Sequence, residues 1–116
     1  MRDGSESGDF PPGMTRYVIG FLWKGPHHGE GSPAEQDEVQ SLHLANTDRM
    51  RKLGALAVAG PFLDDGPLRG LYVFYETSVQ RIRELAAEDP AISGGRLTLE
   101  LHPWLGLEGL RTNDPA

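Results

Sequence analysis

The chain has 116 residues, no cysteine and a formal net charge of −6, from 11 Lys and Arg against 17 Asp and Glu. This length suits one domain with a single core, and the lack of cysteine excludes disulfides, thiol nucleophiles and Cys-based zinc sites. The acidic balance, with no basic stripe, argues against a nucleic-acid partner. No apolar run reaches the length of a membrane span, so we expect no membrane partner.

The first 14 residues are rich in Gly, Ser, Asp and Pro, and we expect a disordered tail over residues 1–14. The segment Met1–Asp9 is polar and acidic, and it lacks the apolar stretch of a signal peptide. A cytoplasmic protein is therefore the default expectation.

Residues 15–23 predict a β-strand in which both faces are apolar. Val18 and Leu22 lie on one face, with Gly20 between them. The other face carries Tyr17, Ile19, Phe21 and Trp23. A strand that is apolar on both faces is expected in the middle of a sheet that is covered on both sides.

Gly and Pro content predicts a loop over residues 24–31. His27 and His28, with Glu30 nearby, are weak indications of a metal, because no second cluster at ligand spacing accompanies them. We therefore expect exposed loop residues and no metal site. Their position after the first strand makes His27 and His28 candidate contacts at the rim of a ligand site.

The sequence Ser32-Pro33-Ala34-Glu35 predicts a helix start, because Ser32 can cap, Pro33 suits the first helical position and Glu35 completes a capping box. The helix should run to about residue 53 and end at Gly54. A stripe at three- and four-residue steps indicates the face that packs on the core. It consists of Val39, Leu42, Asn46, Met50 and Leu53.

His43 lies one helical turn after Val39 and shares that stripe. A histidine that faces inward needs partners for its ring nitrogens. In one interpretation a backbone carbonyl satisfies it, and its role is structural. In the other it is a general acid or base in a pocket, because histidine titrates near neutral pH. This stretch alone favours the structural interpretation.

Residues 55–63 and 70–76 predict two further strands, joined as an antiparallel hairpin by turn residues at 64–67. A last strand is expected over residues 96–102, with Leu97, Leu99 and Leu101 on one face. Pro103 should end that strand, and residues 105–116 should form a C-terminal tail.

A second helix should begin at Thr77, whose spacing to Gln80 matches a capping box. It should end near Asp89, because Pro90 disfavours helical geometry at the preceding residue. Asp89 is then an acid at a helix C-terminus, where the dipole disfavours negative charge. A protonated histidine nearby would relieve this, and the alternative is an ordinary turn-forming Asp-Pro.

The predicted order is β-α-β-β-α-β, the ferredoxin-like α+β pattern, over one domain at residues 15–104. Two helices would cover one face of a four-stranded antiparallel sheet. The other face, apolar in the first strand, would be exposed in a monomer. We therefore expect a homodimer through the open sheet face, in which the two sheets form a barrel-like core.

Taken in order, these residues resemble the YCII-related proteins of the dimeric α+β barrel superfamily over about residues 16–104. The acidic N-terminal tail, the His27–His28 loop and the chain after Trp104 lie outside the resemblance. The matching residues are Tyr17-Val18-Ile19, His43, Gly54, Gly60-Pro61, Asp89-Pro90 and the following Gly94 or Gly95.

The resemblance implies a pocket that holds a histidine and an aspartate, which here are His43 and Asp89. Relatives in the family are linked to lyase-type chemistry, including elimination of chloride from small chlorinated aromatics. No Ser or Cys nucleophile and no phosphate-binding loop is indicated, so the expected enzyme is a cofactor-independent lyase or isomerase. His43 would transfer the proton, and Asp89 would orient the ring.

The expected substrate is a small aromatic or carbonyl compound. Aromatic side chains that we expect to form the walls of its site are Tyr17, Phe21, Trp23 and Phe62. The alternative is a non-catalytic module that binds a small ligand, in which His43 and Asp89 form a structural pair.

Overall fold

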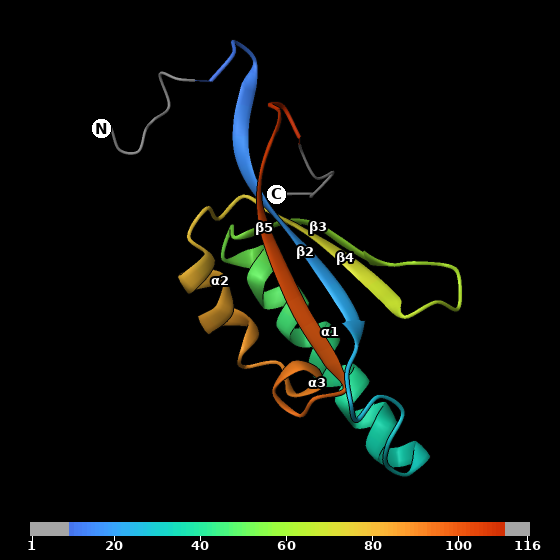
Figure 1. Cartoon of the computed structure of the whole chain (residues 1–116). Coiled ribbons are helices and arrows are strands. Elements are labelled where there is room, and N and C mark those ends of the chain that lie inside the picture. The colour runs from blue at the N-terminus through green and yellow to red at the C-terminus, as the bar shows by residue number, and fades with distance from the viewer. Residues whose placement is uncertain (1–9, 111–116) are drawn as a thin grey trace.

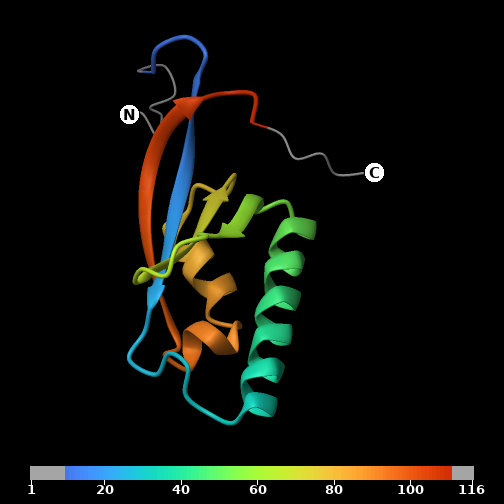
Figure 2. The ribbon, with the colours of Figure 1, turned by 90° about the vertical axis from the view of Figure 1, so that its right-hand side faces the viewer.

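The structure, a computed structural model that describes residues 10–110, is a four-stranded antiparallel sheet with helices on one face (Figures 1 and 2). The ferredoxin-like α+β fold expected from the sequence is confirmed. The strand order is β3-β4-β2-β5. The elements in chain order are β2 (Met14–Lys24), α1 (Pro33–Lys52), β3 (Leu56–Pro61), β4 (Leu68–Phe74), α2 (Val79–Ala86), α3 (Pro90–Ser93) and β5 (Leu97–Leu107).

The expected tails fall largely on residues 1–9 and 111–116, which lie outside the described residues. The strand β5 differs from its prediction, because it continues past His102 to Leu107 and pairs with β2 along its whole length. Pro103 lies opposite Val18 without ending the strand. An edge strand tolerates this, since a proline there can direct its missing N–H away from the only neighbouring strand. Residues 105–107 therefore belong to the sheet and not to a tail.

The core lies between the sheet and the helices. Val18 and Leu22 of β2 face it, together with Tyr72 and Phe74 of β4. Leu97, Leu99 and Leu101 of β5 pack against the same cluster, as their alternation predicted. From the helices and the α1–β3 connection, it receives Met50, Ala55, Ile82 and Leu85.

The helix α1 starts as predicted, with Ser32 as N-cap and a complete capping box with Glu35. Its predicted core stripe is only partly correct. Asn46 and Met50 are buried, whereas Leu42 and Leu53 are exposed. The residues of α1 that line the pocket beneath it are Gln40, His43, Leu44 and Thr47, and of these only His43 was placed on the predicted stripe.

The second helix, α2, begins at Val79, and its N-cap is Ser78 and not Thr77, because the Ser78 hydroxyl accepts the hydrogen bond from the Arg81 amide. The chain then forms a short helix, α3, that the sequence pattern did not predict. Pro90 occupies its first turn, where the lack of an N–H has no cost. The Asp89-Pro90 pair therefore starts a helix instead of only ending one.

The face of the sheet opposite the helices has no cover among residues 10–110 (Figure 2). Ile19, Phe21 and Trp23 of β2 are half-buried there, while Val58 and Trp104 are 41% and 50% exposed. The apolar open face expected from the sequence is thus present. None of the helices within the described range is long and apolar enough to cross a membrane.

Candidate active site

His43 and Asp89, 46 residues apart in the chain, are in direct contact. Nδ1 of His43 lies 2.5 Å from Oδ2 of Asp89. The Asp89 side chain is fully buried, and the His43 side chain is 14% exposed. A carboxylate only accepts hydrogen bonds, so the Nδ1 atom carries the proton. Nε2 of His43 has no hydrogen-bond partner within residues 10–110 and is free to act on a ligand.

Asp89 is held by the helix that follows it. Its second carboxylate oxygen, Oδ1, accepts a hydrogen bond from the Ala91 amide at 2.8 Å, which makes Asp89 the N-cap of α3. This corrects the prediction of an acid placed unfavourably at the end of α2. The cap fixes the carboxylate, and the carboxylate in turn fixes the imidazole of His43.

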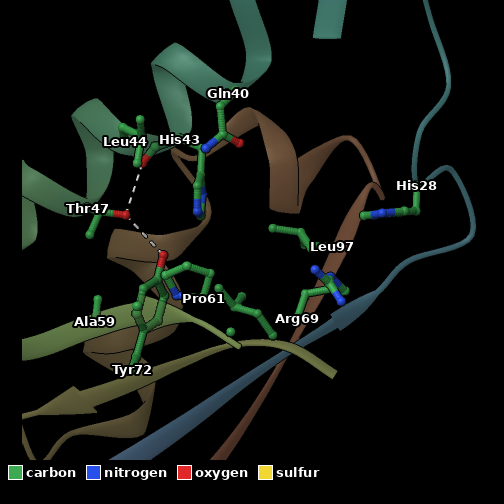
Figure 3. A pocket seen from close by; sticks show the side chains of 13 residues that line it. His28, Gln40, His43, Leu44, Thr47, Ala59, Pro61, Arg69, Tyr72 and Leu97 are labelled. Carbon is green, nitrogen blue, oxygen red and sulfur yellow. Dashed lines mark hydrogen bonds between the residues drawn. The ribbon is translucent and has the colours of Figure 1, made fainter. Parts of the chain in front are cut away.

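A pocket of about 350 Å³ opens between α1 and the helix-facing side of the sheet (Figure 3). Its volume is suitable for a ligand built on a single ring. His43 points into the middle of the pocket in Figure 3. The residues that line it come from four strands, α1 and the loop before α1: Leu22, His28, Gln40, His43, Leu44, Thr47, Ala59, Gly60, Pro61, Arg69, Gly70, Tyr72 and Leu97.

Thr47 and Tyr72 form one side of the pocket and are connected to His43 (Figure 3). The Thr47 hydroxyl donates to the main-chain carbonyl of His43 at 3.0 Å and lies 3.2 Å from the Tyr72 hydroxyl. Burial raises the pKa of Tyr72 from 10.0 to about 12; the hydrogen bond with Thr47 opposes this shift, and the charge of Asp89 adds to it. Tyr72 therefore remains a neutral hydroxyl at physiological pH.

Arg69 and His28 lie on the other side of His43 (Figure 3). Nη1 of Arg69 donates to the carbonyls of Asp64 and Gly66 at 2.8 and 2.9 Å. Nδ1 of His28 is 3.2 Å from the Arg96 carbonyl oxygen. These contacts hold the two basic side chains at the pocket through the backbone of neighbouring loops.

The structure brings together only some of the candidate residues. His43, Asp89 and His28 meet at the pocket or directly behind it. His27 does not line the pocket; its exposed ring lies 3.1 Å from a carboxylate oxygen of Glu30. Within residues 10–110, no group of three or more His, Asp or Glu side chains is placed to hold a metal ion.

The aromatic residues expected as walls are not at this pocket. Tyr17, Phe21 and Trp23 alternate with the core-facing Val18 and Leu22, so they lie on the opposite side of the sheet. Phe62 follows β3 and is likewise absent from the lining. The aromatic wall of the pocket is Tyr72 instead.

Four lining residues with polar side chains, Gln40, Thr47, Arg69 and Tyr72, were not predicted as site residues. Gln40 and Thr47 are three residues before and four residues after His43, so the helical repeat could have placed them on the same face. Tyr72 lies between Leu71 and Val73 in β4. Because side chains alternate along a strand, it points to the face opposite to theirs. The sequence did not indicate Arg69 as a site residue, because a single arginine next to a turn has no characteristic pattern.

The chain matches no known protein-family model. No curated protein is significantly similar to it in sequence. Among solved structures, it is similar to the 5-chloro-2-hydroxyhydroquinone dehydrochlorinase from Burkholderia phenoliruptrix in complex with 2,5-dihydroxybenzoquinone. The TM-score is 0.55 at 17% sequence identity, over 78% of this chain and 93% of that chain. At this level of identity, the likeness shows a shared fold alone, in agreement with the ferredoxin-like α+β fold expected from the sequence.

Proposed function

We propose that this protein is a cofactor-independent lyase or isomerase in which His43 transfers a proton on a small aromatic or carbonyl substrate. The observation that carries the proposal is the contact between Nδ1 of His43 and the fully buried carboxylate of Asp89. In acid–base catalysis, a histidine often acts through one ring nitrogen while a carboxylate accepts a hydrogen bond from the other and orients the ring.

In the proposed reaction, Nε2 of His43 takes a proton from a C–H or O–H group of the substrate. In a lyase, the released electron pair forms a double bond and expels an anion, such as chloride, from a neighbouring carbon. In an isomerase, His43 returns the proton to a different carbon. The negative charge of Asp89 stabilises the imidazolium that forms in either case.

The sequence resemblance and the structural neighbour support the same class of substrate. The resemblance is to YCII-related proteins, and we propose that the chain is a distant member of that family. The neighbour is a dehydrochlorinase that acts on a chlorinated hydroxyhydroquinone. Chlorinated phenols and hydroquinones are therefore the first substrates to assay.

The test is turnover by the purified protein and by His43→Gln. Chloride release from 5-chloro-2-hydroxyhydroquinone and related chlorophenols reports the lyase reaction. Deuterium uptake by small keto compounds in deuterium oxide reports the isomerase reaction. His43→Gln should lower turnover about 10²- to 10⁴-fold. The matched control is His27→Gln, because His27 is exposed and does not line the pocket. Full activity in His43→Gln contradicts the proposal.

The alternative function is a non-catalytic module that binds a small ligand. Full burial of Asp89 favours it, because a buried pair can also hold α1 against α3. In that case His43→Ala would leave an unpaired buried carboxylate and cost about 3 to 5 kcal/mol in stability. Melting of both His43→Ala and Asp89→Asn well below wild type, with no turnover in any assay, favours this alternative. Melting at or above wild type indicates a pair maintained for function.

We also propose a homodimer formed through the open face of the sheet. The half-buried Ile19, Phe21 and Trp23, together with the exposed Val58 and Trp104, support this assembly. Stacking the same face of two copies would bury these side chains around a twofold axis.

A further inference from the structure

The fixed charge among the residues that line the pocket is opposite in sign to the net charge of the chain. The chain carries a formal net charge of −6, yet no Asp or Glu lines the pocket. Arg69 is the fixed charge among the lining residues, and His28 and His43 are the titratable bases. Asp89 lies behind His43, with both carboxylate oxygens already accepting hydrogen bonds. A lining whose fixed charge is a guanidinium, with no carboxylate at its surface, favours an anionic ligand.

Arg69 keeps most of its hydrogen-bonding capacity for such a ligand. Only Nη1 is used, in its bonds to the Asp64 and Gly66 carbonyls. Nε and Nη2 have no partner within residues 10–110, and no carboxylate there pairs with the guanidinium. A guanidinium that is anchored at one nitrogen, with its other donors free, is suited to bind a carboxylate or phenolate oxygen.

Arg69 and His43 are arranged around one cavity. Figure 3 shows both side chains in the space beneath α1, with Leu97 near Arg69 and Tyr72 on the other side of His43. We propose that Arg69 binds the anionic oxygen of the substrate, so that the substrate class is a small planar organic anion. The idea that the bound anion reacts at Nε2 of His43 rests on the proposed function. The binding of an anion by Arg69 does not depend on that function.

The experiment compares the binding of benzoate and benzamide at neutral pH by NMR titration. The two molecules have nearly the same shape, but only benzoate is charged. Wild type should bind benzoate about tenfold more tightly or better, since hydrogen bonds to charged groups are the stronger ones. The Nε–H signal of Arg69 should shift with benzoate and not with benzamide.

Arg69→Gln should remove the preference for benzoate, and Arg69→Lys should restore part of it. The control is Arg83→Gln, an equal loss of charge at an exposed position on α2 that does not line the pocket. Equal affinity of wild type for the two molecules overturns the proposal, as does a preference that survives in folded Arg69→Gln. If Arg69→Gln does not fold, the Arg69 Nε–H signal of wild type decides, and a signal unmoved by benzoate overturns the proposal.

A variant of His43 separates this inference from the proposed function. His43→Gln should lose turnover but keep the preference for benzoate if both are correct. If the catalytic proposal fails and anion binding is real, wild type shows no turnover and still prefers benzoate through Arg69. If His43→Gln removes the preference while Arg69→Gln keeps it, the anion is bound by His43, and the assignment to Arg69 is overturned.

Discussion

Asp89 contacts His43 with one carboxylate oxygen and caps α3 with the other. The 2.5 Å contact to Nδ1 and the 2.8 Å contact to the Ala91 amide use both oxygens of a side chain that has no solvent exposure. A carboxylate held in this way cannot rotate away from the imidazole. This arrangement sets the direction in which Nε2 of His43 meets the pocket.

The substitution Asp89→Asn tests this role. An asparagine can keep the cap through its amide oxygen, but its NH₂ group cannot accept the proton of Nδ1. The imidazole should then shift toward the tautomer with the proton on Nε2, where it no longer acts as a base. Turnover should fall about 10²- to 10⁴-fold, measured as kcat on the best substrate. Asp37→Asn is the control, because Asp37 is an exposed acid on α1. Unchanged kcat in Asp89→Asn would show that the carboxylate does not orient the base.

Tyr72 should make the protein sensitive to alkaline pH. Its folded pKa, about 12, is above its ordinary value of 10.0, so the folded state holds the phenol proton more tightly than the unfolded state. The stability from this shift is fully present below pH 10 and is lost as the pH rises from 10 to about 12. The expected loss is roughly 2 to 3 kcal/mol.

Urea unfolding over this pH range measures the effect of Tyr72. Tyr72→Phe should be less stable at neutral pH by about 1 kcal/mol, since it loses the hydrogen bond with Thr47. It should also lose less stability than wild type above pH 10. Tyr75→Phe, at a more exposed tyrosine, should keep the wild-type pH dependence. An identical pH dependence in wild type and Tyr72→Phe would rule out the raised pKa.

The proposed homodimer should not form when a charge is placed on the open sheet face. Phe21 is half-buried there and contacts the ring of His102 edge-on, at 5.8 Å between ring centroids. Phe21→Glu should leave the monomer folded, because the side chain lies outside the core, and should shift the mass measured by light scattering from two chains to one. Leu63→Glu is the control at a position 98% exposed. A wild-type protein that is already monomeric at high concentration contradicts the assembly.

Gly20 should be intolerant of a side chain. A Cβ at this position would lie 3.1 Å from Leu99, 3.2 Å from Phe74 and 3.3 Å from Leu101. Gly20→Ala should therefore destabilise the fold by about 1 to 3 kcal/mol, the usual cost of overpacking. Gly60→Ala is the comparison, since a Cβ there has open space. Equal denaturant midpoints for the two variants would indicate that the side chains around Gly20 are packed more loosely in solution than these distances imply.

Most of the fold could be predicted from local patterns. The capping box at Ser32, the hairpin turn and the alternating leucines of β5 each determine an element by short-range chemistry. The helix α3 was missed because its four residues are too few for a periodic pattern. The end of β5 was misplaced because a proline ends a central strand but not an edge strand.

The site could be predicted only in part. The sequence resemblance named His43 and Asp89, and their contact is present in the structure. The aromatic side chains expected as walls of the site were assigned to the wrong face of the sheet. Both faces of β2 are apolar, and alternation alone does not tell which face meets the helices. Tyr17, Phe21 and Trp23 are thus separated from the pocket by the sheet. Arg69 and Tyr72 reach it through pairing of strands distant in sequence, which a local pattern does not encode.

The most direct test of the account is the tautomer of the neutral His43 ring, measured from its nitrogen NMR shifts in wild type and Asp89→Asn. The contact with Asp89 predicts a proton on Nδ1 and a bare Nε2 in wild type, with a shift toward the Nε2–H form in the variant. A wild-type ring with its proton on Nε2 would contradict the account, because the nitrogen that faces the pocket could not then accept a proton from a substrate.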